Sequence, residues 1–467
     1  MSMVITEGGS SPGWKYVFEG GKHAIFKYSS GERKGKLLRV RREDLTKKRD
    51  SSNFDYVLGF ILYIREVVFP RLAPYTDIPD IIELTPDQVS ELYKVAVSSG
   101  RIPLLRRTSW ESDDSSTLNH TILASASSDY RQIPGYENQQ GGWSIEIKPK
   151  AGYTTFSPIV DPKRRVKYEM DKFAIQQALI AKNVIQKGWM RTSVTMEISK
   201  YDPLCFFSGE EQQIASALSS LFANPQNYLK VWDEKGSIVH SNKLVNRLSV
   251  EETSFIQKSL AFILHSETVL SKLLQMQLLD ITDADGAVLV YNHLVELYDG
   301  DHAEAENAVD NVDGYIASKP LQSGCLKSSP FQKPICESLD RLLSKVEAFA
   351  DPTSKEQSEL DGIYHQSADI IKTLSKSACI FLLQNWLLSL AMCDVGVLIV
   401  LAPVDGDQST TDITASKNLQ LQGESSPGIM ECDGNKWVYS VKIVDCGNKS
   451  AISLRKLEKK EQYIEKL

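Results

Sequence analysis

The stretch WSIEIKPKAG, residues 143–152, is the most informative part of this 467-residue chain. Apolar and polar residues alternate as far as Ile147, which predicts a β-strand. Side chains two positions apart share one face of a strand, so we expect Lys148 and Lys150 to lie side by side. Two neighbouring ammonium groups repel unless a dense anion joins them, and Pro149 between them marks a strand edge or end. The pair therefore predicts a phosphate-binding site, with a solvated basic edge as the alternative.

The composition is that of a globular protein with ample core. Hydrophobic residues make up 42% of the chain and charged residues 24%, which suffices for two lobes. The net charge of −7 gives no basic field that would attract nucleic acid, so an anion site must come from local clusters of lysine and arginine. The seven cysteines form no CxxC pair, and we interpret them as reduced thiols of an intracellular protein, cytoplasmic or nuclear.

Neither a signal peptide nor a membrane span is expected. Residues 1–13 are polar. The longest apolar stretch, residues 378–402, is interrupted by Gln384, Asn385 and Asp394, and this pattern favours a buried helix followed by a short strand.

The first third of the chain predicts a sheet with helices. We expect strands at 14–18, 23–28, 37–41 and 119–124, a helix at 54–69 that ends at Pro70, and another that opens at Thr85-Pro86. This is the order of a kinase-like small lobe, although many α+β domains begin in the same way.

Beyond Trp143 the patterns are mostly helical. We expect a capping box at Ser208-Gly209-Glu210-Glu211, helices at 269–279 and at 284–298 with Asp283 as its cap, loops around one helix near 335–349, a mobile loop at 404–434, and a closing strand at 437–444.

Four motifs together resemble a known family. The string EIKPK at 146–150, Tyr201-Asp202-Pro203-Leu204, Phe207-Ser208-Gly209 and Asn224-Pro225-Gln226-Asn227 are similar to motifs of the inositol-pentakisphosphate 2-kinases. These enzymes transfer the γ-phosphate of ATP to the last free hydroxyl of inositol 1,3,4,5,6-pentakisphosphate. The resemblance implies a two-lobed, kinase-like α+β fold, with a β-rich N-lobe at 1–125, an enlarged, mostly helical C-lobe at 126–467 and a variable insert at about 299–370.

The resemblance also implies a nucleotide site. Gly20, Gly21 and Lys22 lie between two strands, where the family has its phosphate-covering loop; a plain hairpin turn is the alternative. Arg39 takes the strand position of the phosphate-binding basic residue of kinases. The main chain of Leu123, Ala124 and Ala126 is expected to contact adenine, and Glu146 is assigned to the cofactor side.

Two aspartates are the candidate reactive carboxylates. Asp394 lies between an apolar helix and an apolar strand, where a carboxylate is seldom incidental, although a turn aspartate is the alternative. By resemblance it is the catalytic residue that orients or deprotonates the 2-hydroxyl. Asp445 follows the strand 437–444 directly and matches the aspartate that holds Mg²⁺ on ATP, and Lys449 matches a lysine after it.

A ligand with five phosphates carries about −8 to −10 charges and needs about six cationic side chains around it. The substrate-binding candidates are Arg42 (or Arg41), Arg106, Lys148, Lys150, Asn227, Lys230, Lys449 and Arg455, with Lys167 or Lys172 as weaker ones. The spacing of Cys325, Cys336, His302 and His365 is not a zinc pattern, so we expect no zinc.

Two other functions remain open at this point. The chain could be a binding protein that senses inositol phosphates without catalysis, or a kinase for a lower inositol phosphate. The presence of both Asp394 and Asp445 argues against the first. We expect a monomer with a small-molecule substrate and neither a nucleic-acid nor a membrane partner.

Overall fold

A computed structural model describes the chain over the following residue ranges. These are 5–6, 13–19, 23–31, 33–45, 52–99, 121–133, 136, 141–182, 198–242, 246–311, 337–349, 351–404, 427–432 and 434–467. The fold is α+β, and it divides into two compact units. One unit comprises residues 1–69 and 77–130, and the other comprises 70–76 and 131–467.

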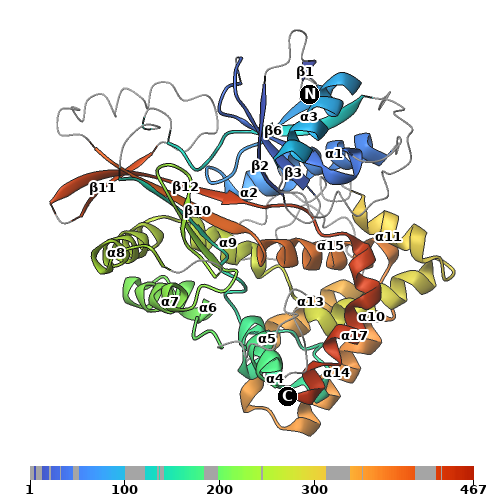
Figure 1. The fold of residues 1–467 in the computed structure, drawn as a ribbon. Helices are drawn as coiled ribbons and strands as arrows, with labels where there is room; N and C mark the ends of the chain where they lie inside the picture. Colours follow the sequence, from blue (N-terminus) through green and yellow to red (C-terminus); the bar gives the residue numbers. More distant parts are fainter. Residues whose placement is uncertain are drawn as a thin grey trace. The chain divides into compact units, whose positions relative to one another are not determined.

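The first unit is built on one sheet with the strand order β1-β5-β6-β4-β3-β2. Figure 1 labels β1, β2, β3 and β6 of this sheet. Its strand pairs are antiparallel except for β1 with β5. The elements are β1 Ile5–Thr6, β2 Trp14–Glu19, β3 His23–Tyr28, β4 Leu37–Arg41, η1 Arg42–Leu45, α1 Ser52–Tyr63, the π-helical η2 Ile64–Val68, α2 Phe69–Leu72, β5 Asp80–Leu84, α3 Pro86–Ser98 and β6 Ile122–Ser127.

Helices α3 and α1 cover opposite faces of this sheet. Ile82 belongs to the core that contains Val89 and Leu92 of α3. Its neighbour Ile81 packs instead with Val57 and other residues of α1. Successive side chains of a strand point to opposite faces, so each helix has its own side.

The predicted strands 23–28 and 37–41 are confirmed, and so is the helix opened by Pro86, whose cap Thr85 forms a capping box with Gln88. Two predictions were wrong. β6 continues to Ser127, three residues further than expected. The helix does not end at Pro70, because a π-helical turn precedes it and shifts the hydrogen-bond register, so that the missing N–H of proline is tolerated.

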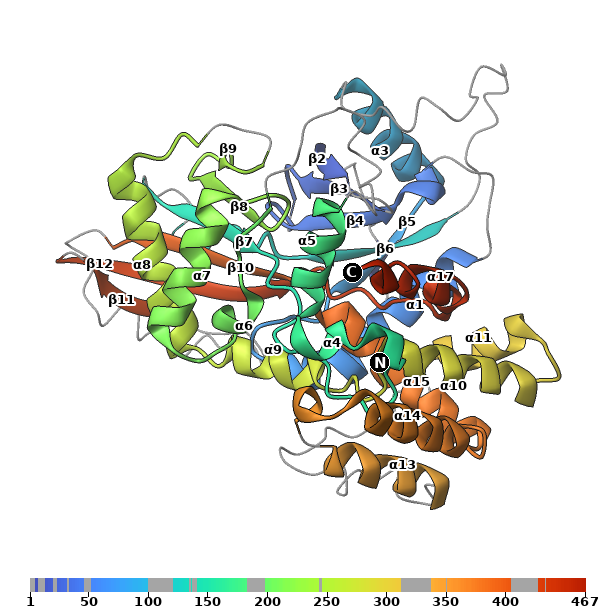
Figure 2. The same ribbon diagram turned by 90° about the horizontal axis from the view of Figure 1, so that it is seen from below.

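The second unit contains an antiparallel sheet of order β11-β12-β10-β7-β8-β9 together with most of the helices (Figures 1 and 2). Its elements are β7 Trp143–Ile147, η4 Pro162–Arg164, α4 Val166–Glu169, α5 Lys172–Ala181, α6 Pro203–Phe206, α7 Glu211–Ala223, β8 Leu229–Asp233, β9 Ile238–His240, α8 Val250–Ser266, α9 Val269–Gln277, α10 Asp283–Leu297, α11 His302–Asp310, α13 Glu337–Ala348, η6 Pro352–Ser354, α14 Gln357–Ile371, α15 Lys376–Met392, β10 Gly396–Pro403, β11 Gly428–Cys432, β12 Asn435–Val444, η8 Ala451–Lys456, α17 Leu457–Glu461 and η9 Ile464–Lys466.

Two groups of helices accompany this sheet. Helix α8 packs on it through Phe255, whose ring lies 4.6 Å from that of Trp437 and 5.6 Å from that of Trp143. Helices α10, α11, α13 and α15 share a separate core with η8 and α17, formed by residues such as Leu294 and Leu382. Figure 2 shows α13 and α14 side by side, and Lys345 donates to Gln366 between them.

The predicted helix and strand within 378–402 are confirmed as α15 and β10, and the predicted strand 437–444 lies within β12. Among the described residues, the structure contains no helix whose length and apolarity would let it cross a membrane. The expectation of a single helix in 299–370 was wrong, because α11 and α14 also form there. The strand β11 lies in the region predicted as a loop.

Two predicted helix caps were also wrong. Glu210, not Ser208, precedes α7 at the N-cap. The hydroxyl of Ser208 accepts from the Glu210 N–H and donates to the carbonyl of Cys205, so it is used in the turn before the helix. Thr282 is the N-cap of α10, and Asp283 is the first residue of the helix, with a left-handed φ of 57° and a buried side chain.

The short segment 70–76 belongs to the second unit although both of its chain neighbours belong to the first. The carbonyl of Tyr75 accepts from Ile443 N at 2.6 Å, which adds a main-chain bond to β12. The hydroxyls of Tyr75 and Tyr439 donate to the two oxygens of Glu267 at 2.7 and 2.9 Å. Burial, followed by the hydrogen bond to Glu267, raises the pKa of Tyr439.

Candidate functional site

The register of the second sheet gathers several predicted site residues at one edge. Gly396 at the start of β10 pairs with Val444 at the end of β12, and Val397 pairs with Ile147 at the end of β7. Ile147 also pairs with Leu229 at the start of β8. Residues that follow β7 and β12 therefore lie beside residues that precede β8 and β10: these are Lys148, Lys150, Tyr228, Asp394, Asp445 and Lys449.

Asp394 is held between two lysines. Lys150 Nζ lies 3.1 Å from Oδ1, and Lys449 Nζ lies 2.6 Å from Oδ2. The carboxylate is half exposed, with 49% of its side-chain surface open to solvent. Partial burial alone would raise the pKa of Asp394, but the two ammonium groups outweigh this effect and hold the pKa below its ordinary value. Asp394 is therefore an ionised carboxylate at neutral pH, with a cation on each oxygen.

The two lysines of the KPK string do not alternate along a strand as predicted, because β7 ends at Ile147. Lys150 has φ 67°, in the left-handed region that most residues avoid. Its ammonium lies 5.0 Å from the ring centre of Tyr228. Lys148 instead approaches Asp445, with Nζ 3.5 Å from Oδ2. The turn thus directs each lysine to a different candidate carboxylate.

Asp445 follows β12 directly and also has a left-handed backbone, with φ 61°. Its side chain is 56% exposed, and the ion pair to Lys148 is long. An accessible carboxylate of this kind fits the usual protein contribution to a Mg²⁺ site, in which one or two carboxylates bind the ion together with phosphate oxygens and water.

The motifs that pointed to this region form its support. The hydroxyl of Tyr201 donates to the carbonyl of Pro149 at 2.8 Å. A Cβ placed on Gly152 would lie 2.3 Å from Cδ2 of Phe207, so the close contact of the Phe207 ring requires glycine there. Asp202 caps α6 by accepting from the backbone N–H groups of Leu204 and Cys205. Tyr201 and Phe207 thus contact the Lys148–Gly152 turn directly, and Asp202 caps the short helix α6 that lies between them in the chain.

Other predicted site residues have partners of their own. Lys230 pairs with Glu146 across the strands, with Nζ 3.3 Å from Oε2. The side chain of Asn227 accepts from Asn242 at 2.6 Å. Arg455 forms a two-pronged ion pair with Glu306 of α11, so its described contacts are with that helix and not with the Asp394 cluster.

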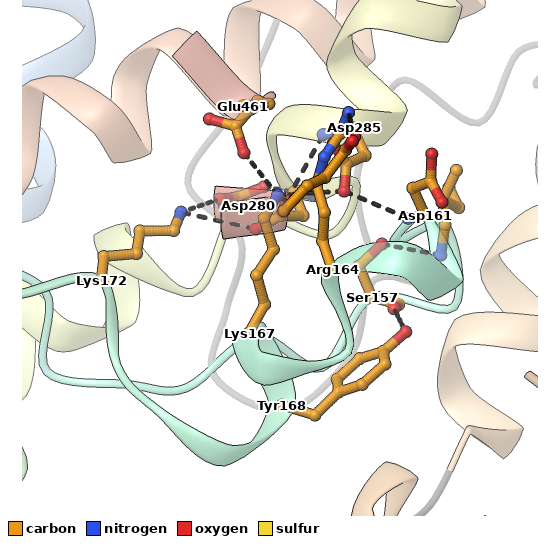
Figure 3. A network of polar contacts seen from close by, with 12 residues as sticks. Ser157, Asp161, Arg164, Lys167, Tyr168, Lys172, Asp280, Asp285 and Glu461 are labelled. Atoms are coloured by element: carbon orange, nitrogen blue, oxygen red, sulfur yellow. Dashed lines mark hydrogen bonds and ion pairs between the residues drawn. The ribbon is translucent and has the colours of Figure 1, made fainter. Parts of the chain in front are cut away.

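Lys167 and Lys172, the weaker candidates for ligand contact, belong to a buried ionic network (Figure 3). Lys167 Nζ lies 2.5 Å from Asp283, 3.0 Å from Asp285 and 2.6 Å from Glu461. These three carboxylates are close enough together to hold a metal ion, but the ammonium of Lys167 occupies the space between them. The ammonium of Lys167 is thus bound by three carboxylates of the chain itself.

Lys172 links this network to the hydroxyl of Tyr153. It pairs with Asp280 at 2.7 Å, and Asp280 also accepts from the hydroxyl of Tyr153 at 3.0 Å. Arg164 pairs with Asp285 and with Glu465. The network therefore joins α4, α5 and α10 to the C-terminal segment, and its cations are engaged with carboxylates.

In the first unit, Arg39 lies on the face of the sheet covered by α1. Its guanidinium is 5.3 Å from the ring centre of Phe60 and within 3.1 Å of His23 Nδ1. Within the described ranges no carboxylate forms an ion pair with it, whereas its neighbour Arg41 is bound by Asp44 through Nε and Nη2. Arg42 is the first residue of η1. Arg39 is thus available to an anion.

The predicted adenine contacts lie inside the sheet. Ala124 and Ala126 are paired with β5 on one side, and Ala126 with β4 on the other. The main chain of Leu123 exchanges hydrogen bonds with the amide of Asn53. The predicted residues Gly20, Gly21, Lys22 and Arg106 lie outside the described residues, as do Cys325 and Cys336.

The sequence did not reveal every residue of the site. Gln277, at the end of α9, contacts both the Lys150 turn and the end of α15, and it carries no charge or motif that would have marked it. Tyr228 was not among the predicted site residues, although its ring lies beside Lys150. Burial, with a further effect of Asp394, raises the pKa of Tyr228 to about 12.

Lysines clustered around two accessible carboxylates are typical of sites that handle phosphorylated ligands in the presence of a divalent cation. Comparison with known proteins agrees. A family model described as inositol-pentakisphosphate 2-kinase matches residues 16–463. The chain is therefore a phosphotransferase of the kinase type. It belongs to the inositol-pentakisphosphate 2-kinase family.

Curated relatives bear the same name at modest identity. An inositol-pentakisphosphate 2-kinase of Oryza sativa subsp. indica is 27% identical over 329 residues, which cover 63% of this chain and 72% of that protein. One from Arabidopsis thaliana is 28% identical over 173 residues, 32% of this chain and 36% of that protein. One from Danio rerio is 26% identical over 235 residues, 49% of this chain and 44% of that protein.

Proposed function

We propose that this chain transfers the γ-phosphoryl group of ATP to the 2-hydroxyl of inositol 1,3,4,5,6-pentakisphosphate and produces the hexakisphosphate. The observation that carries the proposal is the position of Asp394 between Lys150 and Lys449 at the sheet edge. Family membership supports it. The same proposal includes a two-lobed kinase-like fold, with an N-lobe at 1–125 on the nucleotide side and a C-lobe at 126–467 on the inositol side.

The two lysines give Asp394 a role that depends on the substrate. Phosphate groups of the inositol are stronger partners for an ammonium group than a carboxylate is, since each carries more charge. When they take Lys150 and Lys449, Asp394 loses the cations that hold its pKa down, so its pKa rises. The carboxylate then accepts the hydrogen of the attacking 2-hydroxyl and orients the oxygen towards the phosphoryl group.

Asp445 would hold Mg²⁺, which neutralises charge on the transferred phosphoryl group when bound. Lys148 beside Asp445 is placed to contact a phosphate of either substrate. Arg39 and the loop at 20–22 would contact the nucleotide phosphates. The main chain of Leu123 is already engaged by Asn53, so adenine contacts are expected after Ser127, where the chain leaves β6.

The test compares the wild-type protein with Asp394→Asn in the presence of Mg-ATP and inositol 1,3,4,5,6-pentakisphosphate. Products are separated by anion exchange, and substrate affinity is measured by calorimetry. We expect the hexakisphosphate from the wild type and a loss of turnover of about 10²- to 10⁴-fold in Asp394→Asn. Asp369→Asn is the matched control, because it removes an aspartate of a surface ion pair and should leave turnover unchanged.

The alternatives give different results in the same experiment. Tight binding without any product would identify an inositol phosphate sensor. Turnover that is faster with a less phosphorylated inositol in direct competition would identify a kinase for a lower inositol phosphate. In this proposal the enzyme acts as a monomer. Light scattering under turnover conditions should then give the mass of one chain.

A further inference from the structure

Gln277 is the last residue of α9, and its side chain is fully buried, with 0% of the residue exposed. It has no charge and takes no part in the proposed reaction. Its amide nevertheless contacts two separate chain segments that carry the residues of the Asp394 cluster.

Both polar atoms of the Gln277 side-chain amide, Nε2 and Oε1, form hydrogen bonds. Nε2 donates to the main-chain carbonyl of Lys150 at 2.9 Å and to that of Met392 at 3.2 Å. Oε1 accepts from the N–H of Gly152 at 2.9 Å. An amide with two donors and a carbonyl is the side chain that this arrangement of two carbonyls and one N–H requires.

The Lys150–Gly152 turn and the end of α15 must keep their relative positions if Lys150 and Asp394 are to form their ion pair. Met392 ends α15 and stands two residues before Asp394. Lys150 supplies the ammonium that pairs with Asp394 at 3.1 Å, from a left-handed backbone with φ 67°. Such a conformation is retained only when its surroundings fix it. Gln277 contacts the turn on both sides of Ala151 and the helix end together.

The main chain of Gln277 is also held by a hydrogen bond. The hydroxyl of Ser389 in α15 donates to the main-chain carbonyl of Gln277 at 2.5 Å. Ser389 also lies within 3.4 Å of the hydroxyl of Tyr153, which donates to Asp280 of the network shown in Figure 3. Gln277 is therefore anchored to α15 through its main chain and through its side chain.

We propose that Gln277 is a positioning residue that sets the distance between Lys150 and Asp394 by joining the Lys150–Gly152 turn to the end of α15. It acts through these two residues and does not contact substrate. Its effect on turnover rests on the proposed function, whereas its effect on the ion pair does not.

The test uses the full chain with Gln277→Met, which keeps the size of the side chain and removes its hydrogen bonds. Gln277→Asn is the second variant, because the shorter amide cannot reach both carbonyls and leaves a smaller polarity change. The first readout needs no substrate: the rate at which an acylating reagent modifies Lys150, measured by mass spectrometry relative to the exposed Lys372. We expect several-fold faster modification of Lys150 in either variant, since a Lys150 side chain released from the ion pair with Asp394 is more accessible to the reagent.

The second readout is a double-mutant cycle on kcat/KM with Lys150→Met. If Gln277 acts through Lys150, the two losses overlap, and the double variant is little worse than Lys150→Met alone. Losses that multiply would instead mean that Gln277 supports only the general fold, and would overturn the proposal.

Leu342→Ala in α13 is the stability control, because Leu342 is fully buried in the helical core and its truncation leaves a cavity there. It should lower the melting temperature without changing the modification rate of Lys150. An unchanged rate in both folded Gln277 variants would refute the positioning role. If the wild type shows no turnover, the proposed function fails, while the modification rates still decide the role of Gln277.

Discussion

Lys449 Nζ lies 2.6 Å from Oδ2 of Asp394, although 55 positions separate the two residues in the chain. The contact exists because Asp394 precedes β10 and Lys449 follows β12, and these strands pair antiparallel from Gly396 with Val444 onwards. The loop after β12 thus returns to the start of β10. The second oxygen of Asp394 is taken by Lys150, so the carboxylate bridges two loops.

Lys449→Met should weaken substrate binding and change the pH dependence. A charged hydrogen bond to phosphate is worth about 1.5–3 kcal/mol, so KM for inositol pentakisphosphate should rise about ten- to a hundredfold. The lysine also helps to hold the pKa of Asp394 down, so its removal raises that pKa. The acidic limb of a kcat/KM profile between pH 4 and 8 should move to higher pH. A profile identical to that of the wild type would contradict the pairing.

Asp445→Asn should weaken the binding of Mg²⁺ and leave the binding of inositol pentakisphosphate unchanged. The amide keeps the shape of the side chain but offers a neutral and weaker ligand, so half-maximal turnover should need a higher Mg²⁺ concentration. Titration of Mg²⁺ at saturating ATP measures this directly, and calorimetry with inositol pentakisphosphate alone should give the wild-type affinity. A loss of inositol affinity with an unchanged Mg²⁺ requirement would place Asp445 on the substrate side.

Lys167→Met should destabilise the second unit strongly. It leaves Asp283, Asp285 and Glu461 buried together without the cation between them, and removal of one partner of a buried ionic cluster costs about 3–5 kcal/mol. Urea unfolding followed by circular dichroism measures the loss.

The deficit of Lys167→Met should shrink as the pH falls from 7 to 4.5. Without the lysine, burial and mutual repulsion raise the pKa values of the three carboxylates above those of the unfolded chain, so the folded form takes up protons and gains stability in acid. Lys372→Met, which removes only a surface ion pair, is the control and should change stability by less than about 1 kcal/mol at either pH.

Gly152→Ala should disturb the Lys150 turn through Phe207. The added Cβ would lie 2.3 Å from the ring, so either the ring or the turn must move. We expect destabilisation of about 1–3 kcal/mol and a fall in kcat/KM. Adding Phe207→Leu should restore part of the activity by making room. Gly362→Ala meets no atom within 4 Å and should be neutral or stabilising in α14. A Gly152→Ala variant with wild-type activity would show that the turn tolerates the shift.

The elements that could be predicted from sequence are those whose signals are local. The strands at 23–28 and 37–41 alternate regularly, and the helix at Pro86 has a capping box. The helix and strand of 378–402 are long and apolar enough to be recognised without partners. The elements that were missed, such as β5, β8 and β11, are short strands whose identity depends on the neighbours with which they pair.

The candidate site divides in the same way. Asp394, Asp445 and the KPK lysines were marked by their chemistry and by the resemblance to a family. Their pairing could not be deduced, since it depends on strand register between segments more than 200 positions apart, as for Lys150 with Asp394. Gln277 could not be found at all, because a single amide in a helix gives no signal until both of the carbonyls that it contacts are located.

The segment 70–76 has a practical consequence for dissecting this protein. Strand β11 pairs with β12 only from Asn435 to Tyr439, and further along the same strand Tyr75 supplies the main-chain acceptor for Ile443. A fragment that starts at residue 131 would lack this cover and would expose an unpaired strand edge next to Asp445, which invites aggregation. The second unit should therefore be isolated only together with a tethered or added peptide spanning residues 70–76. The gain in solubility from that peptide would measure how strongly the segment binds the edge of β12.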